Sequence, residues 1–213
     1  MNTAFKIPSE LYRGDADKHG ARKLKETIHF GQLQTNLING GEGRLINEVP
    51  LQQLINRHIG INWRHTHFLS FSDNLFTAFR YGIGTSETIT EDIVQQQAEY
   101  PEDMADFGFA IITLHSDKVN WDEIEPGVFE GFYTPSLTKF AMLTEAYRII
   151  LIDVVKVFTL SNNDKYAASL KNALRDNEWL VLPATPVLFN SGQVEYSAIL
   201  DGACISYKKY LQR

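Results

Sequence analysis

The chain has 213 residues, with 20 Lys and Arg against 26 Asp and Glu, and a formal net charge of −6. A hydrophobic content of 44% with 22% charged residues excludes a disordered or fibrous chain, and the length suits one domain, residues 1–213. The single cysteine, Cys204, excludes an internal disulfide framework and a cysteine-built zinc site. With no secretory signal and no apolar run of the ~18–20 residues that a membrane span needs, we expect a cytoplasmic protein without a membrane partner.

Charge is distributed unevenly along the chain. Residues 86–130 hold twelve acidic side chains and one basic side chain, Lys118. The first 25 residues hold six basic side chains and three acidic ones. The basic residues at 18–25 are typical of a solvated helix face, although local basic charge also allows an acidic chain to bind a phosphate-bearing ligand.

The first half of the chain combines short strands with short helices. Apolar spacing, capping residues and glycines predict these elements. We expect a strand at 11–15, a helix at 21–38, a loop at 39–43, a helix from Pro50 to His58, a strand at 67–72, and a helix through 75–81 that is capped by Ser72 or Asp73 and closed by Gly82.

Strands dominate the second half. The patterns predict helices at 90–104, 137–147 and 164–175, the last capped by Asn162 or Asn163, and strands at 107–115, 128–133, 149–160, 178–182, 187–189, 195–200 and 203–207. Helices come early, strands come late, and no regular β-α-β alternation is present. This order favours an α+β fold over a doubly wound parallel sheet.

The common nucleotide-binding, metalloprotease and serine-hydrolase motifs are absent. Two imidazoles, His65 and His67, alternate in a way that would place them on one strand face, as metal ligands require. A third ligand is not identified, and most such histidine pairs are not metal sites, so we predict that the protein holds no metal.

Three separated segments form one pattern. They are residues 11–14 (Leu-Tyr-Arg-Gly), residues 68–72 (Phe-Leu-Ser-Phe-Ser) and residues 177–185, which begin Asn-Glu-Trp. Together they resemble the ADP-ribosyltransferase family in its Arg–Ser–Glu class, with an arginine, a Ser-x-Ser pair and a glutamate on successive core strands. The resemblance implies a single domain with a split, mostly antiparallel sheet, and NAD+ as co-substrate.

The resemblance also implies roles for the residues that would bind NAD+. Arg13 would contact the phosphates through its planar fork, and the Gly14 backbone would approach the nicotinamide. Ser70 would support the nicotinamide ribose, and Ser72 would hold the local turn or the glutamate. An aromatic ring would stack on nicotinamide, and the candidates are Phe71, Phe79 and Tyr81.

Glu178 is the candidate catalytic glutamate. Cleavage of the bond between ribose and nicotinamide creates an oxocarbenium-like centre, and a carboxylate near the ribose 2′-hydroxyl stabilises that charge. Glu145 is the rival assignment, although its neighbours do not reproduce the family pattern. The spacing from Glu178 to Pro183 is one residue longer than the pattern.

Asp176 stands where the family often has Glu or Gln two residues before the catalytic glutamate. Two alternatives are open for this residue. On a strand it would face the same side as Glu178 and orient or deprotonate the acceptor. At the end of the preceding helix, beside Arg175, it would only shape the loop.

The resemblance therefore implies a mono-ADP-ribosyltransferase that moves ADP-ribose from NAD+ to an RNA or DNA base or to a protein side chain. Small enzymes of this kind resemble intracellular toxins, including those of toxin–antitoxin and phage-defence systems. Such a toxin needs a neutralising antitoxin protein, for which the acidic stretch 86–130 is a candidate surface. The alternative is a non-enzymatic interaction module built on an inactive transferase-like fold.

Overall fold

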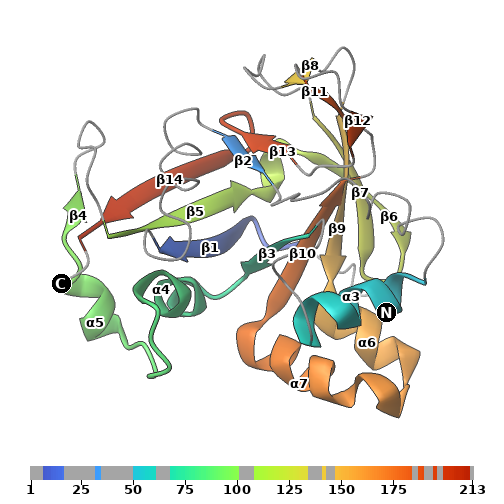
Figure 1. The fold of residues 1–213 in the computed structure, drawn as a ribbon, viewed down its shortest axis with the longest axis horizontal. Coiled ribbons are helices and arrows are strands. Elements are labelled where there is room, and N and C mark those ends of the chain that lie inside the picture. Colours follow the sequence, from blue (N-terminus) through green and yellow to red (C-terminus); the bar gives the residue numbers. More distant parts are fainter. Residues whose placement is uncertain are drawn as a thin grey trace, which may run out of the picture.

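The computed structural model describes residues 7–16, 32–34, 50–60, 68–100, 108–133, 141–142, 147–183, 187–189, 194–195 and 199–211. These residues form an α+β fold (Figure 1). Its helices are α3 (Leu51–Gly60), α4 (Leu75–Ile83), α5 (Glu91–Gln95), α6 (Val154–Ser161) and α7 (Ala167–Asp176), with short 3-10 helices at Ser116–Lys118 and Asp164–Tyr166. Its strands are β1 (Glu10–Ala16), β2 (Gln32–Gln34), β3 (Leu69–Ser72), β4 (Glu99–Tyr100), β5 (Phe109–His115), β6 (Asn120–Glu125), β7 (Val128–Tyr133), β8 (Ala141–Met142), β9 (Tyr147–Asp153), β10 (Glu178–Pro183), β11 (Val187–Phe189), β12 (Val194–Glu195), β13 (Ile199–Asp201) and β14 (Ile205–Tyr210).

The main sheet has nine strands in the order β4-β14-β5-β1-β3-β10-β9-β7-β6. Every strand pair within the described residues is antiparallel. In Figure 1, β14, β5 and β1 run across the picture, whereas β10, β9 and β7 stand nearly upright. The change of direction falls next to β1 and β3, which share the single registered pair Tyr12–Ser72, although β1 pairs with β5 along all seven of its residues.

Helices cover one face of both halves of this sheet. Figure 1 shows α4 below β1 and β5, and α3, α6 and α7 grouped below the upright strands. Phe79 and Phe109 belong to the core under the first half. Ile55 and Leu180 belong to the core under the second half. The opposite face buries a third cluster that includes Leu11, Phe71, Leu151 and Trp179. Because neighbouring residues of a strand point to opposite faces, β3 and β10 contribute to both layers.

Several predicted elements are confirmed. The strands at 128–133 and 187–189 have the predicted bounds. The helix that starts after Pro50 is α3, the helix after the Ser-x-Ser segment is α4, and the predicted helix at 164–175 is a 3-10 turn that leads into α7. At that turn the side chain of Asn163 accepts a hydrogen bond from the Lys165 backbone N–H, as a capping residue does.

The prediction of one long strand at 149–160 is wrong. Strand β9 ends at Asp153, and α6 begins at Val154. The carboxylate of Asp153 accepts the Lys156 backbone N–H at 2.9 Å, so it caps the helix. The apolar, β-branched residues that follow predict a strand by propensity, but the cap and the packing of Val157 and Phe158 in the core decide for a helix.

Other boundaries differ as well. The predicted helix at 90–104 is the short α5, followed by β4, which pairs with β14. Asn74 caps α4, and Gly84, with φ 73°, ends it, whereas Gly82 lies within the helix.

The predicted helices at 21–38 and 137–147 are strand where they are described, at β2, β8 and the start of β9, and the rest of both ranges lies outside the described residues. Strand β6 was not predicted, and helices α6 and α7 follow most of the sheet rather than preceding it.

Gly14 allows α4 to lie directly on β1. A Cβ atom at this position would overlap the carbonyl oxygen of Ala78 and lie 2.7 Å from the Gly82 backbone nitrogen. We predict that Gly14→Ala lowers the free energy of unfolding by about 2–3 kcal/mol, because backbone atoms cannot give way as a flexible side chain does. Urea unfolding measures the change. Gly202→Ala is the matched control, since nothing lies within 4 Å of its Cβ position, and we expect a change within ~0.5 kcal/mol. Equal stability in both variants would contradict the packing role of Gly14.

Candidate active site

Arg13, Ser70 and Glu178 lie on the three adjacent strands β1, β3 and β10. Glu178 is opposite Ser72, and Leu180 is opposite Ser70 in the antiparallel ladder. Cross-strand partners share a face, so Ser70, Ser72 and Glu178 all project from the face of the sheet that the helices cover. Three segments far apart in the sequence therefore meet at the point where the two halves of the sheet join.

Glu178 is half-buried, and Ser70, which projects from the same face of the neighbouring strand, acts on its pKa as a hydrogen-bond donor. The pKa of Glu178 is raised to about 7, mainly by burial and to a smaller extent by the nearby charge of Asp176, while Ser70 and Arg175 act in the opposite direction. At neutral pH this carboxyl group is thus close to an even mixture of its ionised and neutral forms. Such a group can both stabilise positive charge and accept a proton.

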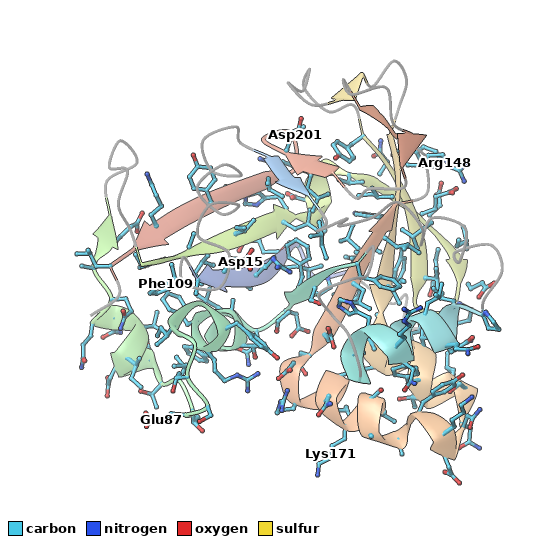
Figure 2. All side chains as sticks on the ribbon, in the orientation of Figure 1. Asp15, Glu87, Phe109, Arg148, Lys171 and Asp201 are labelled. Carbon is cyan, nitrogen blue, oxygen red and sulfur yellow. The ribbon has the colours of Figure 1, made fainter. Side chains whose placement is uncertain are left out.

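Arg13 reaches the site by an indirect route. By strand alternation its side chain belongs with that of Leu11, on the face opposite Ser70 and Glu178. Because β1 and β3 pair only at Tyr12 and Ser72, the guanidinium contacts β3 directly: Nη1 donates to the Ser70 carbonyl oxygen at 3.1 Å. Nε and Nη2 donate to the Asp15 carboxylate at 2.8 and 2.9 Å. Figure 2 labels Asp15 on β1, close to this junction.

His58 is a member of the site that the sequence did not identify as functional. It lies on α3, is 4% exposed, and places Nε2 2.8 Å from the Ser70 Oγ atom. Burial lowers the pKa of His58 to about 3, and the charge of Arg13 adds to this effect, so the imidazole is neutral at physiological pH. The available signal was its position on the apolar face of the predicted helix, beside Leu54 and Ile55, where a histidine needs a buried partner.

Asp176 lies at the end of a helix, not on the strand of Glu178, because it is the last residue of α7. This is the second of the two positions that the sequence left open. Asn177, with φ 45°, ends the helix and separates Asp176 from the strand that begins at Glu178. Arg175 donates to both carboxylate oxygens of Asp176 at 2.8 and 2.7 Å, the Tyr81 hydroxyl donates at 2.6 Å, and Arg80 forms an ion pair.

These contacts decide what the Asp176 carboxylate can do. Burial alone would raise its pKa, but the hydrogen bonds from Arg175, Tyr81 and Arg80 outweigh burial and lower the pKa to about 2. A carboxylate that is so weakly basic and already satisfied is a poor proton acceptor. The contacts give Asp176 a structural role, in which it joins α7 to α4, and its predicted role toward the acceptor stays a prediction.

Ser72 and Gly14 also have structural roles. The Ser72 hydroxyl donates to the Asp176 carbonyl oxygen at 2.6 Å and accepts the Asn74 backbone N–H at 3.0 Å, so it holds the local turn, as one of its two predicted roles states. Gly14 is required by the packing of α4. A contact between the Gly14 backbone and nicotinamide stays a prediction.

The three aromatic candidates differ in exposure. Phe79 is 1% exposed and packs edge-on against Phe109 and Tyr210, and Phe71 is 3% exposed in the core of the opposite face. Neither ring is free to stack on a ligand, which corrects the assignment of Phe79. Tyr81 is 51% exposed and keeps its hydroxyl on Asp176, so it is the candidate that stays accessible.

Some sequence candidates fall outside the described residues, namely Glu145, His65 and His67 and the basic residues 18–25. Within the described part of the chain, no group of three or more His, Cys, Asp or Glu side chains is arranged to hold a metal ion. No helix among the residues that the structure describes is long and apolar enough to cross a membrane.

Comparisons of the chain with protein-family models, curated proteins and solved structures gave no match. What the protein does is therefore inferred from the residues of the site and their geometry.

Glu178 should make the stability of the protein depend on pH. A carboxyl group whose pKa rises on folding stabilises the fold fully below its unfolded value of 4.5 and loses that contribution as pH rises through about 7. We predict that Glu178→Gln, which mimics the neutral form, matches the wild type at pH 5 and is more stable at pH 8 by about 1–2 kcal/mol, below the full linkage value because the group is half-buried.

Urea unfolding at the two pH values measures this difference. Glu123→Gln is the control, because Glu123 is an exposed carboxylate whose pKa is lowered by hydrogen bonds from Lys156 and the Gly127 backbone. We expect no gain in stability at pH 8 from Glu123→Gln. A Glu178→Gln protein that is less stable than the wild type at pH 8 would contradict the raised pKa.

Proposed function

We propose that this protein is an NAD+-dependent mono-ADP-ribosyltransferase with an Arg–Ser–Glu active site. The observation that carries the proposal is the convergence of Arg13, Ser70 and Glu178. The arginine donates to the Ser70 carbonyl oxygen across a sequence separation of 57 residues, and the Ser70 side chain shares a sheet face with Glu178 and acts on its pKa as a hydrogen-bond donor. This is the residue set, on three adjacent strands, that the resemblance in sequence requires.

Arg13 fits the phosphates of NAD+. A guanidinium has five N–H donors, and Asp15 and Ser70 engage three of those of Arg13. The remaining two, on the Nη atoms, are suited to phosphate oxygens. With 24% of its side chain exposed, Arg13 is accessible to a ligand, and Asp15 holds the guanidinium in a fixed orientation. Asp15 also offsets its charge, so recognition would depend on directed hydrogen bonds more than on net charge.

Glu178 is the residue proposed to act on the reacting centre. NAD+ supplies an ADP-ribosyl group whose bond to nicotinamide breaks with the electron pair leaving on the nicotinamide nitrogen. The ionised Glu178 carboxylate would stabilise the positive charge that develops on the ribosyl carbon. The acceptor nucleophile forms the new bond to that carbon and loses a proton. Glu178, with a pKa of about 7, is the better recipient for this proton than Asp176, with a pKa of about 2.

The acceptor is proposed only as a class, a nucleic-acid base or a protein side chain. A toxin or phage-defence role within the cytoplasm, with a neutralising antitoxin protein, rests on analogy with the family. The acidic stretch 86–130 remains the candidate surface for such a partner. Three of its carboxylates are already paired within the chain, in the ion pairs Glu99–Lys208, Glu123–Lys156 and Glu130–Arg148.

We predict that Glu178→Gln lowers the rate of nicotinamide release from NAD+ about 100–1,000-fold, because the amide cannot supply the negative charge. The wild-type rate should rise with pH through a midpoint near 7, as Glu178 ionises. Glu130→Gln is the control, since Glu130 lies on β7 and pairs with Arg148.

Full activity in Glu178→Gln would show that another carboxylate, such as Glu145, carries the reaction. The alternative of an inactive interaction module predicts a different result, namely that the wild-type protein neither binds NAD+ nor releases nicotinamide at any pH.

Arg13 should act through binding rather than turnover. We predict that Arg13→Ala weakens NAD+ binding roughly 10–100-fold and that Arg13→Lys restores little of the loss, because lysine lacks the planar fork. Calorimetric titration of NAD+ into the Glu178→Gln background measures the affinity without turnover. Arg148→Lys, an exposed arginine paired with Glu130, is the control. An unchanged dissociation constant in Arg13→Ala would remove Arg13 from the site.

A further inference from the structure

Resting on the proposed function, we propose that His58 is a positioning residue that donates its Nε2–H to the Ser70 Oγ atom and thereby directs the Ser70 hydroxyl proton onto the Glu178 carboxylate. The three side chains come from α3, β3 and β10, and Ser70 is the middle member. The Nε2 to Oγ distance is 2.8 Å, and Ser70 projects from the same face of the sheet as Glu178, whose pKa it lowers as a hydrogen-bond donor.

Counting protons determines the direction of both hydrogen bonds. An ionised carboxylate only accepts, so the bond between Ser70 and Glu178 requires the single hydroxyl proton of Ser70. Toward His58 the Ser70 oxygen must then accept, and Nε2 must carry the imidazole proton. If the proton were on Nδ1 instead, Nε2 would take the Ser70 proton and Glu178 would lose its donor. The tautomer of His58 therefore decides whether Glu178 is supported.

The surroundings of His58 restrain the imidazole. The ring is 4% exposed and lies 5.2 Å from the Phe68 ring, tilted by 57°. Arg13 of β1 is a charged group that acts on the ring and disfavours a protonated imidazole. A neutral imidazole has one N–H donor and one acceptor nitrogen, so the position of its proton decides whether it donates to Ser70 or accepts from it.

Helix α3 is also fixed relative to Glu178. The Ser169 hydroxyl of α7 donates to the Asn56 side-chain oxygen of α3 at 2.7 Å. Helix α7 ends at Asp176, and β10 begins two residues later at Glu178. The groups that act on the Glu178 charge are Asp176 and Arg175 at the end of α7, and Ser70 of β3. His58 acts on Glu178 only through Ser70, so its effect should appear in the titration of Glu178 rather than in NAD+ affinity.

The wild-type protein provides the first test, which is independent of NAD+. We expect ¹⁵N NMR at pH 9, where Glu178 is ionised, to show His58 as the neutral tautomer with the proton on Nε2. The Nδ1-protonated tautomer or an imidazolium would overturn the proposal. Because this measurement needs no turnover, a wild-type protein that fails to release nicotinamide would contradict the proposed function and still leave the role of His58 decided.

Variants provide the second test. In His58→Leu we expect the pKa of Glu178, followed by ¹³C NMR of its carboxyl carbon, to rise by roughly half a unit to one unit, because the Ser70 hydroxyl is no longer directed. The kcat for nicotinamide release at pH 7 should fall about tenfold, with KM for NAD+ within about twofold of the wild type. His58→Gln should bring both the pKa of Glu178 and the kcat most of the way back to the wild-type values, since an amide N–H can donate to Ser70.

Two controls separate positioning from stability. Asn56→Leu removes the contact of the same helix with Ser169, and His115→Leu removes a second histidine that lies 2.8 Å from a serine hydroxyl, that of Ser206, between β5 and β14. Both are expected to leave the Glu178 titration unchanged. A Glu178 titration that does not move in His58→Leu, or that moves equally in Asn56→Leu, would overturn the proposal. If His58→Leu does not fold, the tautomer of His58 in the wild-type protein decides, because the proposal requires the proton on Nε2.

Discussion

Strands β1 and β3 are neighbours in the sheet but share the single registered pair Tyr12–Ser72, and the site depends on this junction. A continuous ladder would leave Arg13 on the opposite face from Ser70 and Glu178. Because the ladder is not continued, the Arg13 guanidinium donates to the Ser70 carbonyl oxygen, a group that a strand neighbour would otherwise satisfy. The short junction between β1 and β3 thus joins the two halves of the sheet and leaves room for the Arg13 side chain to reach Ser70.

The two carboxylates near the junction have opposite environments. Asp176 is surrounded by Arg80, Arg175 and the Tyr81 hydroxyl, which keep it ionised and connect α7 to α4. Glu178 is half-buried, and among the described residues Ser70 is the hydrogen-bond donor that acts on it, so its proton is held far more strongly than that of Asp176. Neighbouring carboxyl groups with separated pKa values are a common basis for dividing roles in an active site. Here Asp176 is a structural anchor, and Glu178 is the group that we propose to act on the substrate.

Local sequence signals predicted the elements whose stability is local. The strand at 128–133, the helix after Pro50 and the capping role of Asn163 follow from propensity, spacing and side-chain hydrogen bonds within a few residues. The same reasoning failed at 149–160, where a strand and a helix are equally apolar and the Asp153 cap marks the boundary. A continuous apolar run that is buried on both faces shows neither the alternation of a strand nor the 3.6-residue spacing of a helix, so its pattern cannot distinguish the two.

The sequence by itself determined the α+β class and the three segments that hold Arg13, Ser70 and Glu178, because those depend on residue type and order. Only the tertiary structure decided the partners of each side chain. It assigned Asp176 to a helix end, buried Phe79 in the core, and placed His58 2.8 Å from Ser70. These outcomes depend on contacts between residues far apart in the chain, and a hydrogen bond or a pKa shift arises from the groups that packing brings together, which spacing along the sequence does not specify.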